Sequence, residues 1–432
     1  MSQDLADLGL EVVSENDAPD LVVINTCTVT QEATRSSRRA ARRAVEDHPT
    51  SHVVLAGCYA VAEPEEASNI EGVDVVIGND EKERIGEVIS RAFGLQPRSA
   101  LPLLQIGERP KRGRDRTRVN LKVQTGCDEF CTFCIIPFTR GGLRSYPLND
   151  LLTEARRKVD EGARELVLTG VHLGKYGWDS GEPDIALVRL LEGLLEISGL
   201  ARIRLSSILS RHLTDRIVAL LAEQDRICRF LHVPLQAGDD EVLAAMNRPY
   251  RLADYLEAIN RVTERVPGIG LSTDVIVGFP GETHAQFEKT MEVVERVGYL
   301  KLHVFRYSAR PGTPSADYPG QVLEAEKRNR SKELIALGND LRLGFHRRQL
   351  GLVREVFVEE AFENGDLSGH TDDFVRVRFA GPSSLAERLA LVRVVEAKVE
   401  SVRGEFLAEV PWSLARPRGT GVILGSEMRS SL

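Results

Sequence analysis

The first part of the chain alternates short apolar runs with helical stretches. The runs are Leu21–Asn25, Val53–Gly57 and Val73–Gly78. Apolar runs without polar alternation are typical of strands buried on both faces, as in a parallel sheet covered by helices. The pattern therefore predicts a small parallel α/β domain over residues 1–95.

Six further apolar runs follow, each with a helical pattern behind it. They are Val119–Gln124, Leu166–Thr169, Ile203–Ser206, Phe230–Leu235, Ser272–Val277 and Leu302–Tyr307. Six βα repeats predict a partial parallel barrel, (βα)6, over residues 119–345. In such barrels the active site lies at the carboxyl ends of the strands.

After a long charged helical stretch, the pattern changes to short strand-like runs with Gly and Asp turns. The runs are Val353–Glu359, Phe374–Phe379, Ala390–Glu400 and Glu405–Val410. They predict a small β-barrel over residues 346–412, followed by a tail over 413–432. The residues leave open whether this barrel binds nucleic acid or serves dimerisation and packing, because few basic and aromatic side chains interleave.

The composition indicates a globular protein without a membrane segment. The 432 residues are 42% hydrophobic and carry a formal net charge of −8. No apolar run approaches the roughly 20 residues that span a bilayer, and the acidic start of the chain is unlike an export signal. We expect a cytoplasmic protein with reduced thiols, in which clustered cysteines are metal ligands or catalytic groups.

Basic residues concentrate in two stretches despite the negative net charge. A predicted linker over residues 96–118 contains the basic run Arg109–Arg118. A single basic run is more often a solvated face, but two of them favour a polyanionic partner such as RNA. The other stretch is a predicted helix with five arginines, many on one side: Arg35, Arg38, Arg39, Arg42 and Arg43.

Half of the six cysteines lie in one short motif, as Cys127, Cys131 and Cys134. Three thiolates on one loop can hold three corners of a 4Fe–4S cluster and leave the fourth iron open for chemistry. A zinc site usually adds a second pair of cysteines or histidines, and none follows this motif. The motif therefore predicts an iron–sulfur cluster.

Two other cysteines, Cys27 and Cys58, follow two of the predicted strands of the first domain. Neighbouring parallel strands bring such residues together at the carboxyl edge of the sheet. Each cysteine alone is more often a small buried side chain, but the matched placement favours a second metal site. Cys228 matches no such pattern and is interpreted as a buried thiol.

Glycine and polar clusters follow the strands of the predicted barrel. Gly278 and Glu282 suit a nucleotide or amino acid, because glycine lets a ligand approach the backbone and a carboxylate binds an amine or a ribose. Gly170 alone is better explained as an ordinary turn. Gln236 lies in a further polar cluster, directly after the predicted strand Phe230–Leu235. Three histidines near strand ends are interpreted as core residues: His172, His232 and His303.

The cysteine motif resembles that of the radical S-adenosylmethionine (SAM) enzymes. More narrowly, ordered landmarks over nearly the whole chain resemble the methylthiotransferases. These are Asn25–Cys27, Gly57–Cys58, Gly126–Pro137 with Arg140–Gly141, His232–Gly238, Asp274–Thr283 and Tyr307–Pro314. The resemblance implies that the terminal β-barrel is a TRAM domain, which binds RNA.

Within that family, Asn25–Thr30 and Thr169–Gly177 look most like the branch that acts on threonylcarbamoyladenosine beside the tRNA anticodon. The branch acting on isopentenyladenosine is the alternative, and a third branch modifies an aspartate of a ribosomal protein. A non-catalytic, metal-containing RNA-binding protein is the alternative of another class.

The resemblance also implies roles for individual residues. Cys127, Cys131 and Cys134 would hold the cluster that cleaves SAM, and the resulting deoxyadenosyl radical takes a hydrogen from carbon 2 of the adenine. Phe130 and Phe133 would shield this cluster. The residues that would contact SAM are Gly170, Gln236, Gly278 and Glu282.

Cys27 and Cys58 would hold an auxiliary 4Fe–4S cluster that carries the sulfur. Family members have a third auxiliary cysteine after an opening strand, and Met1 here falls inside the helix that follows that strand. Either the start site is assigned too far downstream or the auxiliary site is incomplete.

The partners implied by the resemblance are tRNA and an electron donor such as flavodoxin or ferredoxin. We expect a monomer without a membrane partner. The RNA would contact four arginines: Arg38, Arg39, Arg42 and Arg376.

Overall fold

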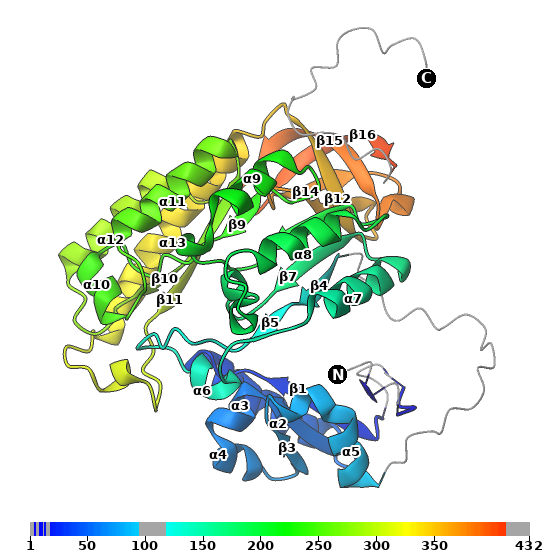
Figure 1. Cartoon of the computed structure of the whole chain (residues 1–432), viewed down its shortest axis with the longest axis vertical. Coiled ribbons are helices and arrows are strands. Elements are labelled where there is room, and N and C mark those ends of the chain that lie inside the picture. The colour runs from blue at the N-terminus through cyan, green and yellow to red at the C-terminus, as the bar shows by residue number, and fades with distance from the viewer. Residues whose placement is uncertain (1–3, 6–7, 12, 14–17, 95–117, 412–432) are drawn as a thin grey trace. The chain divides into compact units, whose positions relative to one another are not determined.

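The computed structural model describes residues 4–5, 8–11, 13, 18–94 and 118–411 (Figure 1). The predicted linker up to residue 117 and the predicted tail lie outside the described residues. The chain divides into two compact units, each built from segments that are distant in the sequence. The first unit is Met1–Arg112, Gly126–Gly142 and Ser308–Asp317, and the second is Gly113–Thr125, Leu143–Tyr307 and Tyr318–Leu432.

The first unit contains a three-stranded parallel sheet in the order β1-β2-β3. Thr26, the last residue of β1, pairs with Gly57, the last residue of β2. This is the predicted parallel α/β arrangement. The elements of the unit are β1 (Leu21–Thr26), α2 (Gln31–Asp47), β2 (His52–Gly57), α3 (Cys58–Ala62), α4 (Pro64–Ser68), β3 (Val75–Ile77), η1 (Glu81–Arg84), α5 (Ile85–Phe93), α6 (Ile136–Arg140) and η5 (Pro314–Asp317).

Both faces of this sheet are covered, because alternate residues of β2 enter two separate apolar clusters. Leu55 packs with Ala41 of α2 and Tyr59 of α3. Val54 packs instead with Ile85 and Ile89 of α5. A strand that buries both faces needs apolar residues at every position, which explains the continuous apolar run.

The second unit contains six parallel strands followed by a closed barrel whose pairs are antiparallel except for the parallel pair β14-β16. The strands form two sheets, β4-β7-β8 and β9-β10-β11, which are joined by the parallel bridge between Ser207 and His232. The strands are β4 (Arg118–Lys122), β7 (Glu165–Thr169), β8 (Arg202–Leu205), β9 (Phe230–His232), β10 (Gly270–Val277) and β11 (Lys301–Arg306), with the short pair β5 (Gln124–Thr125) and β6 (Arg144–Ser145). The six predicted βα repeats are confirmed.

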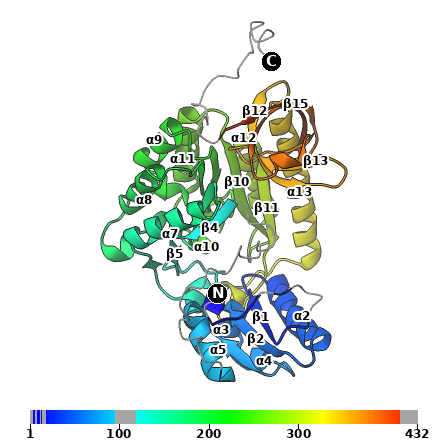
Figure 2. The same cartoon turned by 90° about the vertical axis from the view of Figure 1, so that its right-hand side faces the viewer.

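Helices follow the strands and cover the outside of this curved layer (Figure 2). α13 packs along β11 and continues toward the C-terminal barrel. The helices are α7 (Leu148–Asp160), α8 (Ala186–Leu195), α9 (Asp215–Glu223), α10 (Asp240–Ala245), α11 (Leu252–Arg265), α12 (His284–Val297) and α13 (Glu324–Arg347), and the short η2 (Leu173–Lys175), η3 (Trp178–Ser180) and η4 (Ser210–His212) lie between strands and helices. Among the described residues, no helix is both long and apolar enough to cross a membrane.

The C-terminal strands close into the predicted small β-barrel, in the order β12-β13-β14-β16-β15. Its elements are β12 (Val353–Ala361), β13 (Asp366–His370), β14 (Arg376–Ala380), η6 (Ser383–Leu385), β15 (Leu389–Ala397) and β16 (Val402–Val410). The sequence analysis missed β13, whose residues Asp-Leu-Ser-Gly-His contain no apolar run. This strand is held by backbone pairing to both of its neighbours, β12 and β14.

Buried ion pairs connect the amino ends of β7 and β8 to this barrel. Arg204 Nε donates to Glu165 at 2.7 Å, and Arg202 Nη2 donates to Glu355 of β12 at 3.0 Å. Burial by itself would raise the pKa of Glu165, but the charges of Arg204 and Arg202 outweigh that effect and lower it. The barrel is thus fastened to the end of the strands opposite their carboxyl ends.

Replacing the buried carboxylate by Glu165→Gln should lower the free energy of unfolding by about 3–5 kcal/mol, because two buried guanidinium groups lose a counter-charge. The folded-state pKa of Glu165 lies below its unfolded value, so its contribution is present at neutral pH and is lost as the pH falls through the folded-state pKa. Urea titrations at neutral and acidic pH measure both effects.

The matched control is Glu154→Gln, which removes a more exposed carboxylate paired with Lys158 at 3.1 Å. It should change the unfolding free energy by less than about 1 kcal/mol. Equal losses in the two variants would contradict the stabilising role of the buried pair.

Candidate active site

Five of the six cysteines lie in the first compact unit. Cys27 is exposed directly after β1, and Cys58 is buried as the first residue of α3, directly after β2. The parallel pairing of Thr26 with Gly57 places these two cysteines after the ends of neighbouring strands, as predicted. The segment Gly126–Gly142, with Cys127, Cys131 and Cys134, belongs to the same unit.

The loop that carries the cysteine motif is closed by its own backbone. Cys127 N donates to Gly141 O at 3.1 Å, and Cys134 N donates to Cys131 O at 3.0 Å. Burial raises the pKa of the Cys127 thiol, and the backbone amide of Glu129 opposes this shift. The loop is therefore a defined turn in which three thiols follow one another at short spacing.

Phe130 lies inside the motif in an unusual conformation. Its φ angle is +40°, a value that bulky residues adopt only when the surroundings impose it. Its side chain is 57% exposed and meets Phe138 edge-on, with ring centroids 6.1 Å apart. The shielding role of Phe130 and Phe133 stays a prediction. The exposed aromatic surface in this region is formed by Phe130 and Phe138.

Two side chains donate hydrogen bonds to the buried sulfur of Cys58. Arg140 Nε lies 3.2 Å from Cys58 Sγ, and Asn79 Nδ2 lies 3.4 Å from it. Asn79 Nδ2 also donates to Thr139 O at 2.7 Å, which ties the end of β3 to α6. Donors aimed at a sulfur stabilise its thiolate form and suit a cluster ligand.

The sequence analysis missed Asn79 and assigned no role to Arg140. Arg140 is six positions after the last cysteine of the motif, and Asn79 is far from any cysteine in the sequence. The only indication in the sequence of a role for Arg140 was the pair Arg140–Gly141 after the motif, which resembles a landmark of the family. Their contact with Cys58 depends on how α6 packs on α3 within the unit.

The four residues predicted to contact SAM lie in the second unit, beyond the carboxyl ends of three strands. Gly170 follows β7, where Gln124 Oε1 accepts from His172 N at 2.9 Å. Gln236 follows β9 with a φ of +68° and pairs with Val275 of β10 through an isolated bridge. Both residues border the edge where ligands bind in open parallel folds.

Gly278 and Glu282 form a tight turn after β10. Gly278 N donates to the Glu282 carboxylate at 2.6 Å, and Arg330 Nη1 donates to it at 2.7 Å. Burial raises the pKa of Glu282, while the Gly278 amide and Arg330 oppose this shift. Glu282 thus orders the turn itself, and its predicted contact with SAM stays a prediction.

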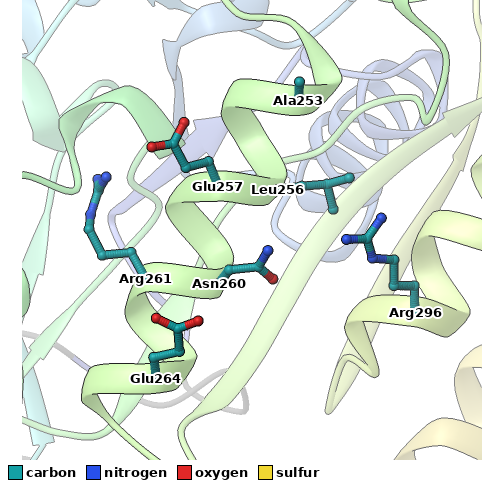
Figure 3. Close-up of a pocket in the computed structure, with 7 residues that line it drawn as sticks. All are labelled: Ala253, Leu256, Glu257, Asn260, Arg261, Glu264 and Arg296. Atoms are coloured by element: carbon teal, nitrogen blue, oxygen red, sulfur yellow. The ribbon is translucent and has the colours of Figure 1, made fainter.

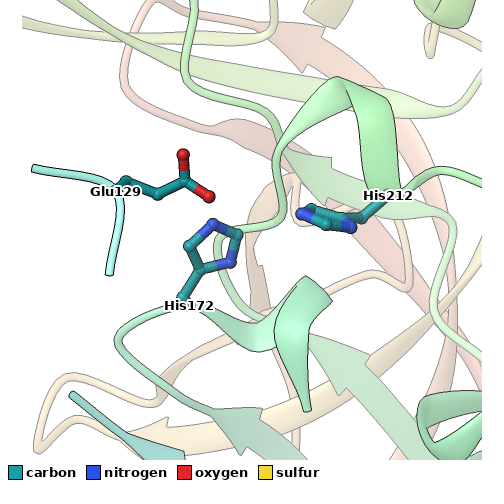
Figure 4. Close-up of side chains that lie close together, drawn as sticks. All are labelled: Glu129, His172 and His212. Atoms are coloured by element: carbon teal, nitrogen blue, oxygen red, sulfur yellow. The ribbon is translucent and has the colours of Figure 1, made fainter. Parts of the chain in front are cut away.

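A buried basic cluster follows β7 and β8. His172 and His212 meet at 5.1 Å between ring centroids (Figure 4), and Trp178 packs edge-on against His212. Lys175 is only 6% exposed and its ammonium lies 5.3 Å from the Trp178 ring. We call these four residues the basic cluster; it gives the carboxyl edge of the strands a polar wall that contains one ammonium group, that of Lys175.

The other two histidines near strand ends, His232 and His303, are half-buried, and their interpretation as core residues stays a prediction. His232 contacts Ser272 Oγ through Nδ1 at 2.8 Å and Asp274 through Nε2 at 3.2 Å. Burial lowers the pKa of the neighbouring His303. Cys228 is buried as predicted, and burial raises its pKa to about 12, so it stays a thiol at neutral pH.

The arginines predicted to contact RNA differ in their surroundings. Arg39 and Arg42 are exposed on α2, whereas Arg38 is paired with Glu63 and Glu66 and donates to the Tyr59 hydroxyl at 3.1 Å. Arg376, on β14, pairs with Glu360 at 3.1 Å. Arg39 and Arg42 therefore present the less compensated positive charge.

A surface pocket of about 600 Å³ lies along α11, with Arg296 of α12 on its far side (Figure 3). Glu257, Arg261 and Glu264 line it with mixed charge. None of the predicted site residues belongs to it, so we assign it no part in the reaction.

Comparisons with known proteins define the class of the protein. A model of the radical SAM superfamily matches residues 121–294, and a model of the Uncharacterized protein family UPF0004 matches residues 1–78. A radical SAM methyltransferase of Kitasatospora setae, solved with cobalamin and a 4Fe–4S cluster, has a similar fold: the TM-score is 0.54 at 16% identity, over 70% of this chain and 66% of that one. The fold and the cysteine motif together define a radical SAM enzyme.

Sequence relatives identify the family. A threonylcarbamoyladenosine tRNA methylthiotransferase of Bacillus subtilis is 37% identical over 90% of this chain and 89% of its own length. A tRNA-2-methylthio-N(6)-dimethylallyladenosine synthase of Novosphingobium aromaticivorans is 36% identical over 94% of this chain and 93% of its own length. The chain belongs to the radical SAM methylthiotransferase family, and the non-catalytic alternative is wrong.

Enzymes of this family use SAM and two 4Fe–4S clusters. The residues present fit the first of these clusters and supply two cysteine ligands, Cys27 and Cys58, for the second. The closed loop supplies three thiols, which leaves one iron of a cubane for SAM. At the second site, a buried sulfur with two N–H donors and an exposed thiol after the neighbouring strand are ligands of the right chemistry.

Gly126→Ala should remove the iron of one cluster, because the added Cβ would lie 1.7 Å from Gly142 O and the loop would have to open. Iron content after anaerobic reconstitution measures this loss.

The matched control is Gly141→Ala. Gly141 has a similar φ, +70° against +75° for Gly126, but an added Cβ there meets nothing within 4 Å. Both variants place a side chain on a residue of positive φ, which costs roughly 1 kcal/mol or more, and the overlap with Gly142 O adds to that cost only in Gly126→Ala. Full iron content in Gly126→Ala would show that the loop closure is dispensable.

Proposed function

We propose that the protein inserts a methylthio group at carbon 2 of N6-threonylcarbamoyladenosine next to the anticodon of tRNA. Relatives from Bacillus subtilis and Thermotoga maritima that bear the corresponding name are 37% and 36% identical to it. Dimethylallyladenosine synthases reach 36%, so identity alone does not choose between the substrates.

The basic cluster is the observation that carries the choice. Lys175 and the imidazoles of His172 and His212 are buried at the carboxyl edge of β7 and β8. The threonylcarbamoyl substituent ends in a carboxylate, which a buried ammonium binds through a charge-assisted hydrogen bond. An isopentenyl substituent is apolar and has no carboxylate that could accept such a hydrogen bond.

We assign the cofactor ligands on the same basis. Cys127, Cys131 and Cys134 hold the radical cluster, which when bound supplies the electron that cleaves SAM. Cys27 and Cys58 hold the auxiliary cluster, with Arg140 and Asn79 orienting the Cys58 sulfur. The chain's own residues exclude water from Cys58 and Cys131, which are 1% and 7% exposed.

The turns after β7, β9 and β10 border the SAM site. We propose that Gly170, Gln236 and Gly278 of these turns contact SAM. Glu282 accepts a hydrogen bond from Gly278 N and so fixes the conformation of the turn after β10.

The remaining proposals concern partners and organisation. Exposed Arg39 and Arg42, with Arg38, and Arg376 on the C-terminal barrel contact the tRNA backbone. A flavodoxin or ferredoxin supplies electrons to a monomer in the cytoplasm. The functional modules are residues 1–95, 119–345 and 346–412.

An enzyme for isopentenyladenosine is the second candidate, supported by the dimethylallyladenosine synthases among the relatives. The relatives named above bear the names of tRNA-modifying enzymes, which favours tRNA over a ribosomal protein as the substrate.

Cys131→Ala should abolish SAM cleavage, whereas Cys58→Ala should spare cleavage and stop sulfur insertion. The physical reason is that the first thiol belongs to the loop that leaves an iron open for SAM, and the second belongs to the separate auxiliary site. Deoxyadenosine release and methylthio product are measured on the same samples. Equal loss of cleavage in both variants would contradict the assignment.

The substrate is tested by offering the reconstituted enzyme two tRNAs, one with threonylcarbamoyladenosine and one with isopentenyladenosine, followed by mass analysis of the nucleosides. We expect methylthio product from the first only. Lys175→Met should lower kcat/KM for that tRNA by roughly 10- to 100-fold, the effect of one lost charge-assisted hydrogen bond.

The control is Lys332→Met, which replaces an exposed lysine of α13. It should leave kcat/KM unchanged, and SAM cleavage should be intact in both variants. Product on the isopentenyladenosine tRNA alone would refute the proposed substrate.

A further inference from the structure

A second, smaller pocket lies where η4 packs on α11, within the second unit. Its volume is about 250 Å³, below the roughly 300–1,000 Å³ of sites that hold drug-sized ligands. None of the residues predicted to contact SAM lines it. A ligand of this pocket is therefore small and separate from SAM. The polar and charged lining residues are Ser210, Arg211, Tyr250, Asp254, Glu257 and Arg261.

One lining group is a buried hydroxyl. Ser210 is 1% exposed, and its Oγ has no hydrogen-bond partner in the part of the chain that the structure describes. Buried polar atoms are rarely left unpaired, so this hydroxyl favours a ligand with a polar atom at its end of the pocket. The next residue, Arg211, contributes a guanidinium to the same lining. An anionic oxygen matches both groups.

The charges around the pocket are of both signs. Arg211 and Arg261 are cationic, whereas Asp254 and Glu257 are anionic. Glu257 and Arg261 lie four positions apart on one side of α11 (Figure 3). Among the described residues, no basic group lies within 4.0 Å of the Glu257 carboxylate, so this charge is not cancelled by an ion pair. A plain anion or cation would meet repulsion as well as attraction here, but a zwitterion matches both signs.

Two of these charged side chains are held in place by the fold. Arg261 Nη2 donates to Leu213 O at 2.8 Å, at the end of η4. The Asp254 carboxylate accepts from Arg251 N at 3.2 Å, at the start of α11. Groups that are already ordered lose less side-chain entropy when a ligand binds. One cation and one anion of the pocket are thus preorganised.

The remaining lining is apolar. Pro249 and Ala258 line the pocket together with Tyr250. The Tyr250 hydroxyl donates to Pro234 O at 2.9 Å and to Leu235 O at 3.0 Å, so the ring is the part left for a ligand. An α-amino acid with an apolar side chain therefore matches the pocket in size, charge and polarity.

The chemistry of the family releases such a molecule. When SAM takes up one electron, its sulfonium bond breaks, and the products are the deoxyadenosyl radical and free methionine. At neutral pH methionine is a zwitterion, and its side chain is apolar and flexible enough to fit an irregular surface.

We propose that this pocket binds a free α-amino acid with an apolar side chain, namely the methionine released from SAM. The carboxylate accepts from the Ser210 hydroxyl and pairs with Arg211 and Arg261. The ammonium donates to Asp254 and Glu257. No bond is made or broken in this step. The inference depends on SAM cleavage and not on which adenosine is modified.

Calorimetric titration of the anaerobically reconstituted full chain with methionine tests the proposal. SAM is present at saturation, so that the open iron is occupied, and no reductant is added, so that SAM is not cleaved. Glu257→Gln should weaken methionine binding roughly 10-fold, the lower range for a hydrogen bond to a charged group. Ser210→Ala should weaken it roughly 3- to 10-fold, the effect of one neutral hydrogen bond.

The matched control is Glu264→Gln. Glu264 is an exposed carboxylate of the same helix that lines the larger pocket but not this one. Its replacement should leave the dissociation constant of methionine unchanged. Glu257 is exposed as well, so Glu257→Gln should fold like the control.

Two further probes test the zwitterion itself. N-acetylmethionine lacks the ammonium and methionine amide lacks the carboxylate, so each should bind at least about 10-fold more weakly than methionine. N-acetylmethionine that binds as tightly as methionine would make this an anion site and overturn the proposal.

Two other results would also overturn it: no methionine binding to the unaltered protein, or a constant that neither Glu257→Gln nor Ser210→Ala changes. The substrate proposal fails separately. Methionine binding that depends on Glu257, together with product only on isopentenyladenosine tRNA, would refute the proposed substrate and support the amino-acid site.

Discussion

Parallel strand pairing is the constraint on which both units depend. Because paired parallel strands run in one direction, the loops behind them emerge at one edge of the sheet. In the first unit, the pairing of Thr26 with Gly57 brings the positions of Cys27 and Cys58 to neighbouring strand ends. In the second, the same rule gathers the basic cluster and the turns after β9 and β10. In open parallel sheets, ligands bind outside the carboxyl ends of the strands, where the loops leave backbone and side chains accessible.

The opposite edge of the six strands serves stability. Glu165 and Arg202 begin β7 and β8, and their ion pairs reach the C-terminal barrel through Glu355. Arg204 also stacks on Phe374, 4.7 Å from its ring centroid. Each of these buried charges has several partners, and these interactions offset the free energy that it costs to remove the charges from water. The same interactions attach the barrel to the strands. Arg310 contrasts with these buried charges, because its described partners are neutral and one of its donors is unused.

The buried sulfur of Cys228, that of Cys58 and those of the cysteine motif differ in the hydrogen-bond donors around them. Cys228 lies in a fully buried setting that raises its pKa to about 12, and it remains a thiol. Cys58 is equally buried but receives N–H donors from Arg140 and Asn79. Cys127, Cys131 and Cys134 share a turn closed by backbone hydrogen bonds, and the backbone amide of Glu129 donates to the Cys127 sulfur. Burial alone therefore does not distinguish a structural thiol from a ligand; the donors that surround the sulfur do.

The sequence alone determined the fold class, the six βα repeats, the C-terminal barrel and the cysteines worth examining. Continuous apolar runs, helical periodicity and cysteine spacing are local properties, and local patterns survive in a single sequence. It did not reveal β13, because Asp366–His370 is held by backbone pairing on both sides and needs no apolar run. Nor did it reveal the donors to Cys58 or the incomplete hydrogen bonds of Arg310. Asn79, Arg140 and Thr28 meet their partners across long stretches of chain, so only the tertiary structure decided which sulfur receives N–H donors and which buried guanidinium keeps an Nε without a partner among the described residues.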